Sequence, residues 1–288
     1  MQASPSMTHD QRQQAARLLW THWQAGTTLE ALPTELRPMS RSEGYAIQAQ
    51  LPAVGARTVV GWKIAATSAA GQAHIRVSGP LAGRLLSGQI DPNVENDNDN
   101  DSDNDNDGGG TTLTLAGNRM RVVEPEFAFR FGTDLAPRAE PYSVPQVLDA
   151  VDTLHPALEI PDSRYAVFTQ VGEAQLIADN ACAHRFILGA AAPAAWRGID
   201  LRTHRVHGEV FNALGRRISR EGDGSVVLGD PRMALAWLVN ELSGLGITLT
   251  AGQFVTTGTC MVPLEVAPGD KVRADYGVLG RMAVNFSA

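Results

Sequence analysis

The stretch Val122–Phe131, VVEPEFAFRF, decides the fold expected for this chain and carries its most informative side chains. Side chains along a β-strand point alternately to its two faces. One face therefore carries Phe127 and Phe129, which predicts a strand packed on an apolar core, and the other carries Glu124 and Glu126. Two carboxylates two residues apart on one strand point the same way, so both lie within reach of a single cation.

This pair of glutamates has two interpretations. Neighbouring anions in a sheet are unfavourable unless a positive group lies between them, which favours a metal site. Pro125 donates no backbone hydrogen bond, so it predicts a sheet edge or a bulge, and such positions often line active sites. The same pattern is also compatible with a solvated strand that carries two surface glutamates.

The segments on either side of this strand predict a mixture of helices and strands. Helices are expected over residues 9–25, from Ser40 with Glu43 as its capping-box partner, over 143–154, and from Asp230 to about Gly244. Strands are expected over 57–67, within 79–90, over 112–115 and 157–160, in a hairpin within 200–228, and around a PGD turn at 268–270. Helices and strands do not alternate regularly, so the sequence predicts an α+β fold around a coiled, barrel-like mixed sheet.

The overall charge carries little information about partners. The formal net charge is −7, but seven acidic residues and no basic one lie between Glu95 and Asp107, so the rest of the chain is balanced. The balance indicates neither nucleic acid nor a membrane surface as a partner. No apolar run predicts a membrane span, and the N-terminus lacks a secretory signal pattern. Cys182 and Cys260 form no CxxC pair and suit a reducing compartment, which predicts a cytoplasmic location.

The acidic tract at about residues 93–110 is predicted to be a disordered insertion between two strands, because it contains almost nothing to bury. Its DNDNDG segment, residues 103–108, imitates the first half of a calcium-binding EF-hand loop. The twelfth position of such a loop requires a glutamate and here is Thr114, so the sequence does not predict an EF-hand.

Glu159, in PALEIPDSRY at residues 156–165, could supply a third carboxylate. It ends a short apolar strand just before a predicted turn, where an isolated buried carboxylate is costly unless it is paired or bound to metal. Three carboxylates without histidine or thiolate favour Mg²⁺ or Mn²⁺, with water completing the octahedron. The residues alone leave open whether Glu159 joins the other two.

Lys63, in VVGWKIAA at residues 59–66, is the candidate proton-transfer group. A lysine inside an apolar strand loses hydration, so its amine is easier to deprotonate and can act as a base near neutral pH. The alternative is a lysine that extends its ammonium to the surface from a strand end.

Two further segments are weaker candidates. IADNACAHRFILG, residues 177–189, could line a pocket with polar groups, although a turn with a satisfied core histidine at His184 is favoured. Gly258, in VTTGT, could let the backbone approach a ligand or could mark a bulge.

In this order, the motifs resemble the fumarylacetoacetate hydrolase superfamily, in the branch of the 2-oxopent-4-enoate hydratases and 4-oxalocrotonate decarboxylases. The resemblance covers nearly the whole chain apart from the acidic tract. The matching pieces are GWKIAAT at 61–67, GPLAGRL at 79–85, EPEFAFRF at 124–131, PALEIPDSRY at 156–165, IADNACAHRFILG at 177–189, and the C-terminal segment that begins with AGQFVTTGT at 251. Arg281 departs from the pattern, since a small residue usually follows the last LG.

The resemblance implies a role for several residues. Glu124, Glu126 and Glu159 would be the ligands of Mg²⁺ or Mn²⁺, and Lys63 would be the catalytic lysine. Substrate-binding residues would be Leu81, a loop residue acting through its backbone amide, and Asn180. The implied fold is the superfamily's mixed β-roll over residues 58–288, preceded by a helical part over 1–57 and assembled into homo-oligomers.

The resemblance also implies an activity. A glutamate as third ligand favours a hydratase or a decarboxylase over the acylpyruvate hydrolases, which typically use an aspartate. The expected reaction is the addition of water to a 2-hydroxy-2,4-dienoate in the meta-cleavage catabolism of aromatic compounds, alongside a partner enzyme of that pathway. The alternatives are decarboxylation of 2-oxo-3-hexenedioate, C–C hydrolysis of an acylpyruvate, and a catalytically silent binding protein.

Overall fold

The computed structural model describes residues 7–92 and 110–288. The insertion predicted at 93–110 lies outside the described residues, except for Gly110. Of the helices in these two ranges, none is both long and apolar enough to cross a membrane.

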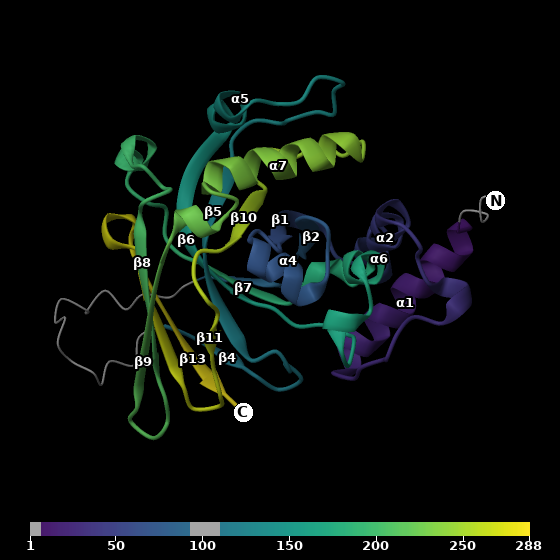
Figure 1. The fold of residues 1–288 in the computed structure, drawn as a ribbon, viewed down its shortest axis with the longest axis horizontal. Helices are drawn as coiled ribbons and strands as arrows, with labels where there is room; N and C mark the ends of the chain where they lie inside the picture. Colours follow the sequence, from purple (N-terminus) through teal and green to yellow (C-terminus); the bar gives the residue numbers. More distant parts are fainter. Residues whose placement is uncertain (1–6, 93–109) are drawn as a thin grey trace.

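Helices and strands are interspersed along the chain (Figure 1). The α-helices are α1 (His9–Ala25), α2 (Arg41–Gln48), α3 (Leu51–Val54), α4 (Ala69–Ile75), α5 (Val144–Asp149), α6 (Glu173–Ala178) and α7 (Pro231–Gly244). The strands are β1 (Val59–Ala65), β2 (Leu81–Leu86), β3 (Ile90–Pro92), β4 (Thr111–Thr114), β5 (Val122–Phe131), β6 (Val151–Ile160), β7 (Arg185–Leu188), β8 (Arg205–Phe211), β9 (Arg217–Asp223), β10 (Phe254–Thr259), β11 (Leu264–Glu265), β12 (Lys271–Asp275) and β13 (Arg281–Ser287).

The larger sheet is mixed and strongly curled. Its strand order is β2-β1-β10-β5-β6-β7-β3, and β11 adds to β5. β5 is antiparallel to β10 and β6, whereas β1 is parallel to β10 and β3 is parallel to β7. The two end strands are separated along the chain by residues 87–89 alone, so the sheet must curl until its ends meet. The predicted barrel-like mixed sheet is therefore confirmed.

The two faces of this sheet have different surroundings. Phe127, Phe129 and Phe131 are fully buried in the main core, together with residues of the second sheet and of α7. Figure 1 shows α7 lying across β5, β6 and β10. The opposite face, which carries Glu126, holds a separate small cluster on the inside of the curl. That cluster contains Leu85, Ala128, Ala157 and Phe186.

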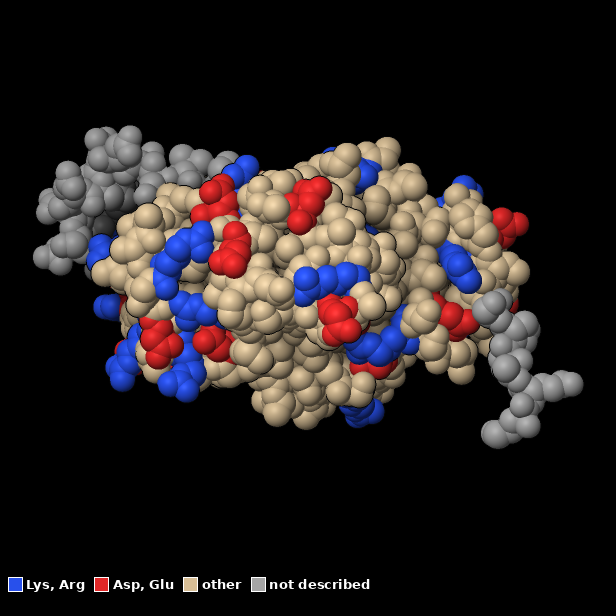
Figure 2. Space-filling view, turned by 90° about the horizontal axis from the view of Figure 1, so that it is seen from above, with Lys and Arg blue, Asp and Glu red and all other residues tan. Residues whose placement is uncertain are grey.

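A second sheet has the order β4-β13-β12-β8-β9. β8 and β9 form the predicted hairpin, in which Arg205 pairs with Asp223 and Phe211 with Arg217. α7 begins at the predicted cap, because the Asp230 side chain accepts a hydrogen bond from the Arg232 amide, and it ends at Gly244 as predicted. On the face seen in Figure 2, acidic and basic side chains are intermixed.

The N-terminal helices form their own small core. α1 has a complete capping box between Thr8 and Gln11 and ends at Gly26, whose φ of 62° suits glycine. Buried residues of α1, α2 and α3 cluster with Tyr165 and Ala178 of the later chain. α2 packs against α6, so the helical part shares contacts with the rest of the protein. The division at residue 57 stays a prediction. Figure 1 shows α1 at one end of the molecule and the β8–β9 hairpin at the other.

The helix predicted over 143–154 is wrong in its second half. The Ser143 cap and Pro145 do start a helix, but α5 ends at Asp149 and β6 runs from Val151 to Ile160. This strand pairs with β5 from Val151 to Glu159. The long pairing with β5 replaces the local helical preference, and Pro156 would have broken a longer helix in any case.

The edge position suggested by Pro125 is also wrong, because β5 lies between β10 and β6. The alternative, a bulge, agrees with the structure. The pairing of β10 with β5 shifts register between Thr256 and Thr259, opposite Glu126. The strand that contains Pro125 is therefore central, and the irregularity lies in its neighbour.

Candidate metal centre

The three predicted ligands come together because β5 pairs with β6. Glu124 lies directly opposite Glu159 in the antiparallel register, and Glu126 follows two residues along the same face of β5. One carboxylate oxygen from each lies within 4.8 Å of the others. Like charges directly opposite each other destabilise a sheet, so the pair Glu124 and Glu159 calls for a positive group between them.

Burial makes this arrangement unfavourable without a cation. Glu126 and Glu159 are 0% and 1% exposed, while Glu124 is half-buried at the open end. Burial, followed by repulsion from Glu159, raises the pKa of Glu124 to about 7. The same two causes raise the pKa of Glu126, and burial raises that of Glu159.

Some of the carboxylate oxygens are free to coordinate. Oε1 of Glu126 and Oε2 of Glu159 are buried and accept no hydrogen bond from the described residues. Orphaned buried oxygens are costly in a folded protein. A hard divalent ion satisfies such oxygens, so the residues present fit a metal of that kind.

Lys63 lies beside the three glutamates. It pairs with Gly83 of β2 and Thr256 of β10, and its Nζ is 3.1 Å from Oε1 of Glu159. The side chain is 3% exposed, which excludes the alternative of a lysine extended to the surface. Gly83 leaves room for the lysine stem, since a Cβ there would lie 3.0 Å from Lys63 Cγ and Cδ.

The expected easy deprotonation of Lys63 is wrong for the metal-free site. Burial alone lowers the pKa of its ammonium, but Glu159 and Glu124 outweigh burial and raise it. The raised pKa favours the charged ammonium of Lys63 in this arrangement. The sequence showed the apolar strand but not the carboxylates of β5 and β6 that face the amine.

A strained turn provides the second hydrogen-bond partner of Lys63, the carbonyl of Ala181. Asn180, Ala181 and Cys182 have φ values of 57°, 51° and 63°, the left-handed region that residues other than glycine rarely adopt. This turn aims the carbonyl of Ala181 at Lys63, whose Nζ donates to it at 2.9 Å. Strain of this kind persists only where surrounding contacts enforce it, and it clusters at functional sites.

Asn180 is one of the residues that enforce the turn. Its Oδ1 accepts from the Arg84 amide at 2.7 Å, and its Nδ2 donates to the Arg84 carbonyl at 2.8 Å. Asn180 is 1% exposed, and both polar atoms of its side chain form hydrogen bonds with the outer edge of β2. Its predicted contact with substrate stays a prediction.

Other side chains complete the same edge of β2. The Tyr45 hydroxyl accepts from the Ala82 amide at 3.1 Å, and Gln48 donates to the Ala82 carbonyl at 2.8 Å. Gln89 accepts from the Leu86 amide at 2.6 Å. Leu81 is the first residue of β2 rather than a loop residue. Because the Ala82 and Arg84 amides point outward, the amide of Leu81 points toward β1.

Gly258 marks a bulge, one of its two predicted possibilities, while the approach of its backbone to a ligand stays a prediction. Its φ of 92° places it in the irregular part of β10, and its amide donates to Oε2 of Glu126 at 3.0 Å. A Cβ at this position would lie 2.3 Å from Oγ1 of Thr67. Only glycine combines this conformation with such a close approach.

The chain between β1 and β2 lies at the open end of the site. β1 is parallel to β10 and β10 is antiparallel to β5, so the end of β1 and the start of β5 lie on the same side. This connection, residues 66–80, contains α4, which has no buried residue.

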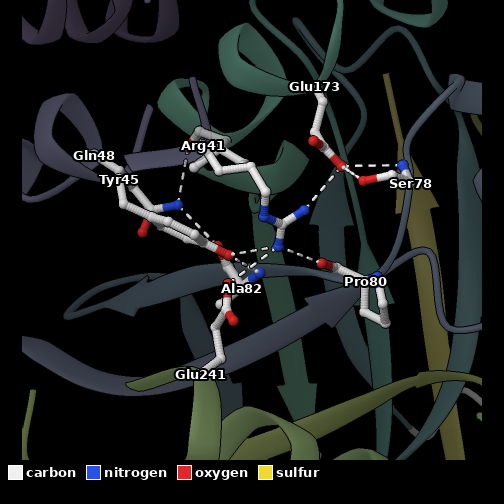
Figure 3. Close-up of polar contacts among 9 residues, drawn as sticks. Arg41, Tyr45, Gln48, Ser78, Pro80, Ala82, Glu173 and Glu241 are labelled. Carbon is white, nitrogen blue, oxygen red and sulfur yellow. Dashed lines mark hydrogen bonds and ion pairs between the residues drawn. The ribbon is translucent and has the colours of Figure 1, made fainter. Parts of the chain in front are cut away.

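Arg41 of α2 holds the end of this connection (Figure 3). Its guanidinium pairs with Glu173 at 2.8 Å and with Glu241 at 3.0 Å, and it donates to the Pro80 carbonyl at 2.9 Å. Glu173 also accepts from the amide and hydroxyl of Ser78, both at 3.0 Å. Helices α2, α6 and α7 thus fix the chain where it enters β2.

The remaining candidates of the 177–189 segment are structural. Asp179 accepts from Ser163 at 2.6 Å and forms a buried ion pair with Arg164. Nδ1 of His184 lies 3.2 Å from the Asn118 amide group, and burial, then nearby arginines, lowers the pKa of His184 to about 4. His184 is only partly buried and lines a cavity together with Trp23 and Asp162, so the favoured interpretation as a satisfied core histidine holds for its Nδ1 contact but not for a place in the core.

Two contributors to the site could not be predicted from the sequence. One is the carbonyl of Ala181, since a backbone group turned by local strain leaves no signal in residue type. The other is Tyr276, which is fully buried and contacts the backbone of Glu126 from the second sheet. Arg281 is exposed and pairs with Asp275 at 3.1 Å.

Comparison with known proteins gives a consistent result, although no family model matches the chain. A 2-keto-4-pentenoate hydratase of Paraburkholderia xenovorans (strain LB400) is 31% identical over 285 residues, which cover 98% of this chain and 97% of that protein. A 4-oxalocrotonate decarboxylase of Pseudomonas putida is 36% identical over 140 residues, 49% of this chain and 51% of that protein. The structure of 4-oxalocrotonate decarboxylase from Pseudomonas putida G7, complexed with magnesium and adipate, has a TM-score of 0.81 at 24% identity and covers 98% of this chain and 100% of that chain.

The curled sheet and the full-length likeness place the chain in the fumarylacetoacetate hydrolase superfamily. Within it, the chain belongs to the branch of the 2-keto-4-pentenoate hydratases and 4-oxalocrotonate decarboxylases. The resemblance inferred from the ordered motifs is confirmed.

Proposed function

We propose that this chain is a divalent-metal-dependent hydratase that adds water to a 2-hydroxy-2,4-dienoate of the 2-oxopent-4-enoate type. The product is a 4-hydroxy-2-oxo acid. The observation that carries the proposal is the convergence of Glu124, Glu126 and Glu159 beside a buried Lys63. The full-length identity to 2-keto-4-pentenoate hydratases supports it.

Glu124, Glu126 and Glu159 would hold the ion, which we propose to be Mg²⁺ or Mn²⁺, since all three donors are carboxylates. A bound divalent ion supplies Lewis-acid stabilisation of negative charge on the 2-oxygen of the substrate. Two buried carboxylate oxygens without a partner among the described residues support this assignment.

Lys63 is proposed to move the proton. The reaction needs a proton at C5 of the dienoate and the loss of the 2-hydroxyl proton, and water then adds its hydroxyl at C4 and its hydrogen at C3. The Lys63 ammonium, held at 2.9 Å by the Ala181 carbonyl and at 3.1 Å by Glu159, is a fixed donor on a side chain that is 3% exposed. A positioned acid–base group of this kind contributes about 10²–10⁴-fold to the rate.

Two observations bear on the choice between hydratase and decarboxylase. The full-length 31% identity to 2-keto-4-pentenoate hydratases favours hydration. Decarboxylation of 2-oxo-3-hexenedioate remains the second candidate because of the local 36% identity to a decarboxylase.

One assay separates the two reactions. The purified protein is incubated with 2-hydroxypenta-2,4-dienoate or with 2-oxo-3-hexenedioate, each with Mg²⁺ or Mn²⁺, and both the 4-hydroxy-2-oxo acid and CO₂ are measured. We expect water addition to the dienoate, and no turnover in the matched Glu126→Gln variant. CO₂ release from the hexenedioate without hydration of the dienoate would identify a decarboxylase instead.

Further features belong to the same proposal. We propose that the Leu81 amide and Asn180 lie close to the bound substrate, and that the protein is a cytoplasmic homo-oligomer. Its place would be the meta-cleavage catabolism of aromatic compounds, alongside an enzyme that supplies the dienoate.

A further inference from the structure

Tyr276 reaches the candidate metal centre from the other sheet. It follows β12 and is 0% exposed. Its hydroxyl accepts a hydrogen bond from the Glu126 amide at 2.9 Å and donates one to the Ala157 carbonyl at 2.7 Å. Glu126 and Ala157 are cross-strand partners in the β5–β6 ladder. The phenol oxygen therefore bonds to the backbone of both members of this pair.

This bridge occurs where the other neighbour of Glu126 is irregular too. On the β10 side, the register shifts between Thr256 and Thr259, and the Gly258 amide donates to Oε2 of Glu126. Glu126 is thus held by a hydroxyl at its amide and by a backbone N–H at one carboxylate oxygen. These two contacts fix the residue and leave Oε1 of Glu126 without a partner among the described residues.

Tyr276 is itself held firmly. Its amide donates to the Gly280 carbonyl at 2.9 Å, and Nε2 of His204 donates to its carbonyl at 2.7 Å. Its ring meets Phe127 edge to face, with ring centroids 5.8 Å apart. Because Phe127 follows Glu126, the ring and the hydroxyl of Tyr276 contact two successive residues of β5.

We propose that Tyr276 is a positioning residue of the metal centre, whose hydroxyl holds the backbone of β5 and β6 at Glu126 and Ala157 and so sets the geometry of the three carboxylates. The inference rests on the proposed metal-binding function. Without the hydroxyl, the Glu126 amide and the Ala157 carbonyl both lose this partner, and the carboxylate of Glu126 is held less firmly. Partners of metal ligands of this kind change metal affinity by about 10–100-fold when they are removed.

The two common hard cations provide a test that a general loss of stability would not imitate. Mg²⁺ requires nearly ideal octahedral geometry, whereas Ca²⁺ accepts flexible coordination. A displaced Glu126 should therefore weaken Mg²⁺ binding more than Ca²⁺ binding. Loss of stability alone would leave the ratio of the two dissociation constants unchanged.

The experiment is calorimetric titration of the metal-free full-length protein with Mg²⁺ and with Ca²⁺. For Tyr276→Phe we expect Kd for Mg²⁺ to rise about tenfold or more and Kd for Ca²⁺ to rise less than about threefold. Tyr165→Phe is the matched control, because Tyr165 is 2% exposed, its hydroxyl has no partner among the described residues, and it lies in the N-terminal cluster. Its two constants should stay within about twofold of wild type.

His204→Ala keeps the test usable if Tyr276→Phe does not fold, as judged by circular dichroism. It removes the bond to the Tyr276 carbonyl and should shift the Mg²⁺ to Ca²⁺ ratio in the same direction by a smaller factor. An unchanged ratio in the folded Tyr276→Phe, or in His204→Ala if that alone folds, overturns the inference while the metal site stands. A wild-type protein that binds neither ion overturns the metal site and the inference with it.

Discussion

Glu124→Gln should stabilise the metal-free protein and abolish metal-dependent turnover. Glu124 faces Glu159 across the β5–β6 ladder, and its pKa is raised from 4.5 to about 7, first by burial and then by Glu159. The folded state therefore binds the proton more tightly than the unfolded chain. The stability that this proton contributes to the folded state is fully present below about pH 4.5 and is lost as the pH rises through about 7.

The size of the effect follows from the pKa difference. At pH 8.5 the ionised Glu124 costs the fold up to about 3 kcal/mol, since each tenfold change in proton affinity corresponds to about 1.4 kcal/mol. Glu124 is half-buried, so solvent reduces the expected gain from glutamine to about 1–3 kcal/mol. For a chain of this size the melting temperature should rise by about 2–10 °C.

The assay is thermal unfolding in EDTA at pH 5 and pH 8.5, followed by circular dichroism. Wild type should melt at a lower temperature at pH 8.5 than at pH 5, and Glu124→Gln should show a smaller difference. Glu140→Gln, at an exposed glutamate, should behave as wild type. Saturating Mg²⁺ at pH 8.5 should raise the melting temperature of wild type alone, because only binding to the folded state stabilises it. A Glu124→Gln variant that melts at or below the wild-type temperature in EDTA at pH 8.5 would refute the reasoning.

Three further outcomes are expected. Lys63→Met should keep the circular dichroism spectrum and the metal affinity but lower kcat by about 10²–10⁴-fold. Lys63→Arg should be nearly as damaging, because a guanidinium does not release its proton. Near-wild-type turnover in Lys63→Met would contradict the catalytic role of Lys63. Because Glu124 must ionise to bind metal, Kd for Mg²⁺ measured by calorimetry should weaken by up to about tenfold for each pH unit below about 7, and a flat profile between pH 5.5 and 7 would contradict the assignment. Asn180→Ala should lower the free energy of unfolding in urea by about 2–4 kcal/mol, since it leaves the amide and carbonyl of Arg84 unpaired, and a loss below about 0.5 kcal/mol would mean that water replaces both bonds.

Local patterns predicted the parts of the fold that depend on local chemistry. The cap at Asp230, the β8–β9 hairpin and the alternation in VVEPEFAFRF depend on neighbouring residues, and the structure has all three. The alternation placed Glu124 and Glu126 on one face correctly. It could not place Glu159 opposite Glu124, because that requires the pairing of β5 with β6.

Features that depend on distant parts of the chain could not be predicted. The direction of the pKa shift of Lys63 depends on carboxylates from other strands, so an apolar strand around the lysine suggested the opposite sign. The segment 143–154 has helical periodicity, yet ten residues from Val151 onward form a strand because β5 offers a partner. Tyr276 carries no local sign of its contact with Glu126, since its hydroxyl arrives from the second sheet.

The capped outer edge of β2 has a consequence for the behaviour of the protein in concentrated solution. An uncovered strand edge is a template on which another chain can add a strand and begin to aggregate. Here the outward amides of Ala82, Arg84 and Leu86 already bond to side chains, so another molecule finds no free donor at these positions. Each of these amides is protected by a single side chain, so one substitution such as Asn180→Ala would leave the amide and carbonyl of Arg84 free to pair with another chain. Such a variant should form β-rich aggregates on mild heating, before the rest of the protein unfolds.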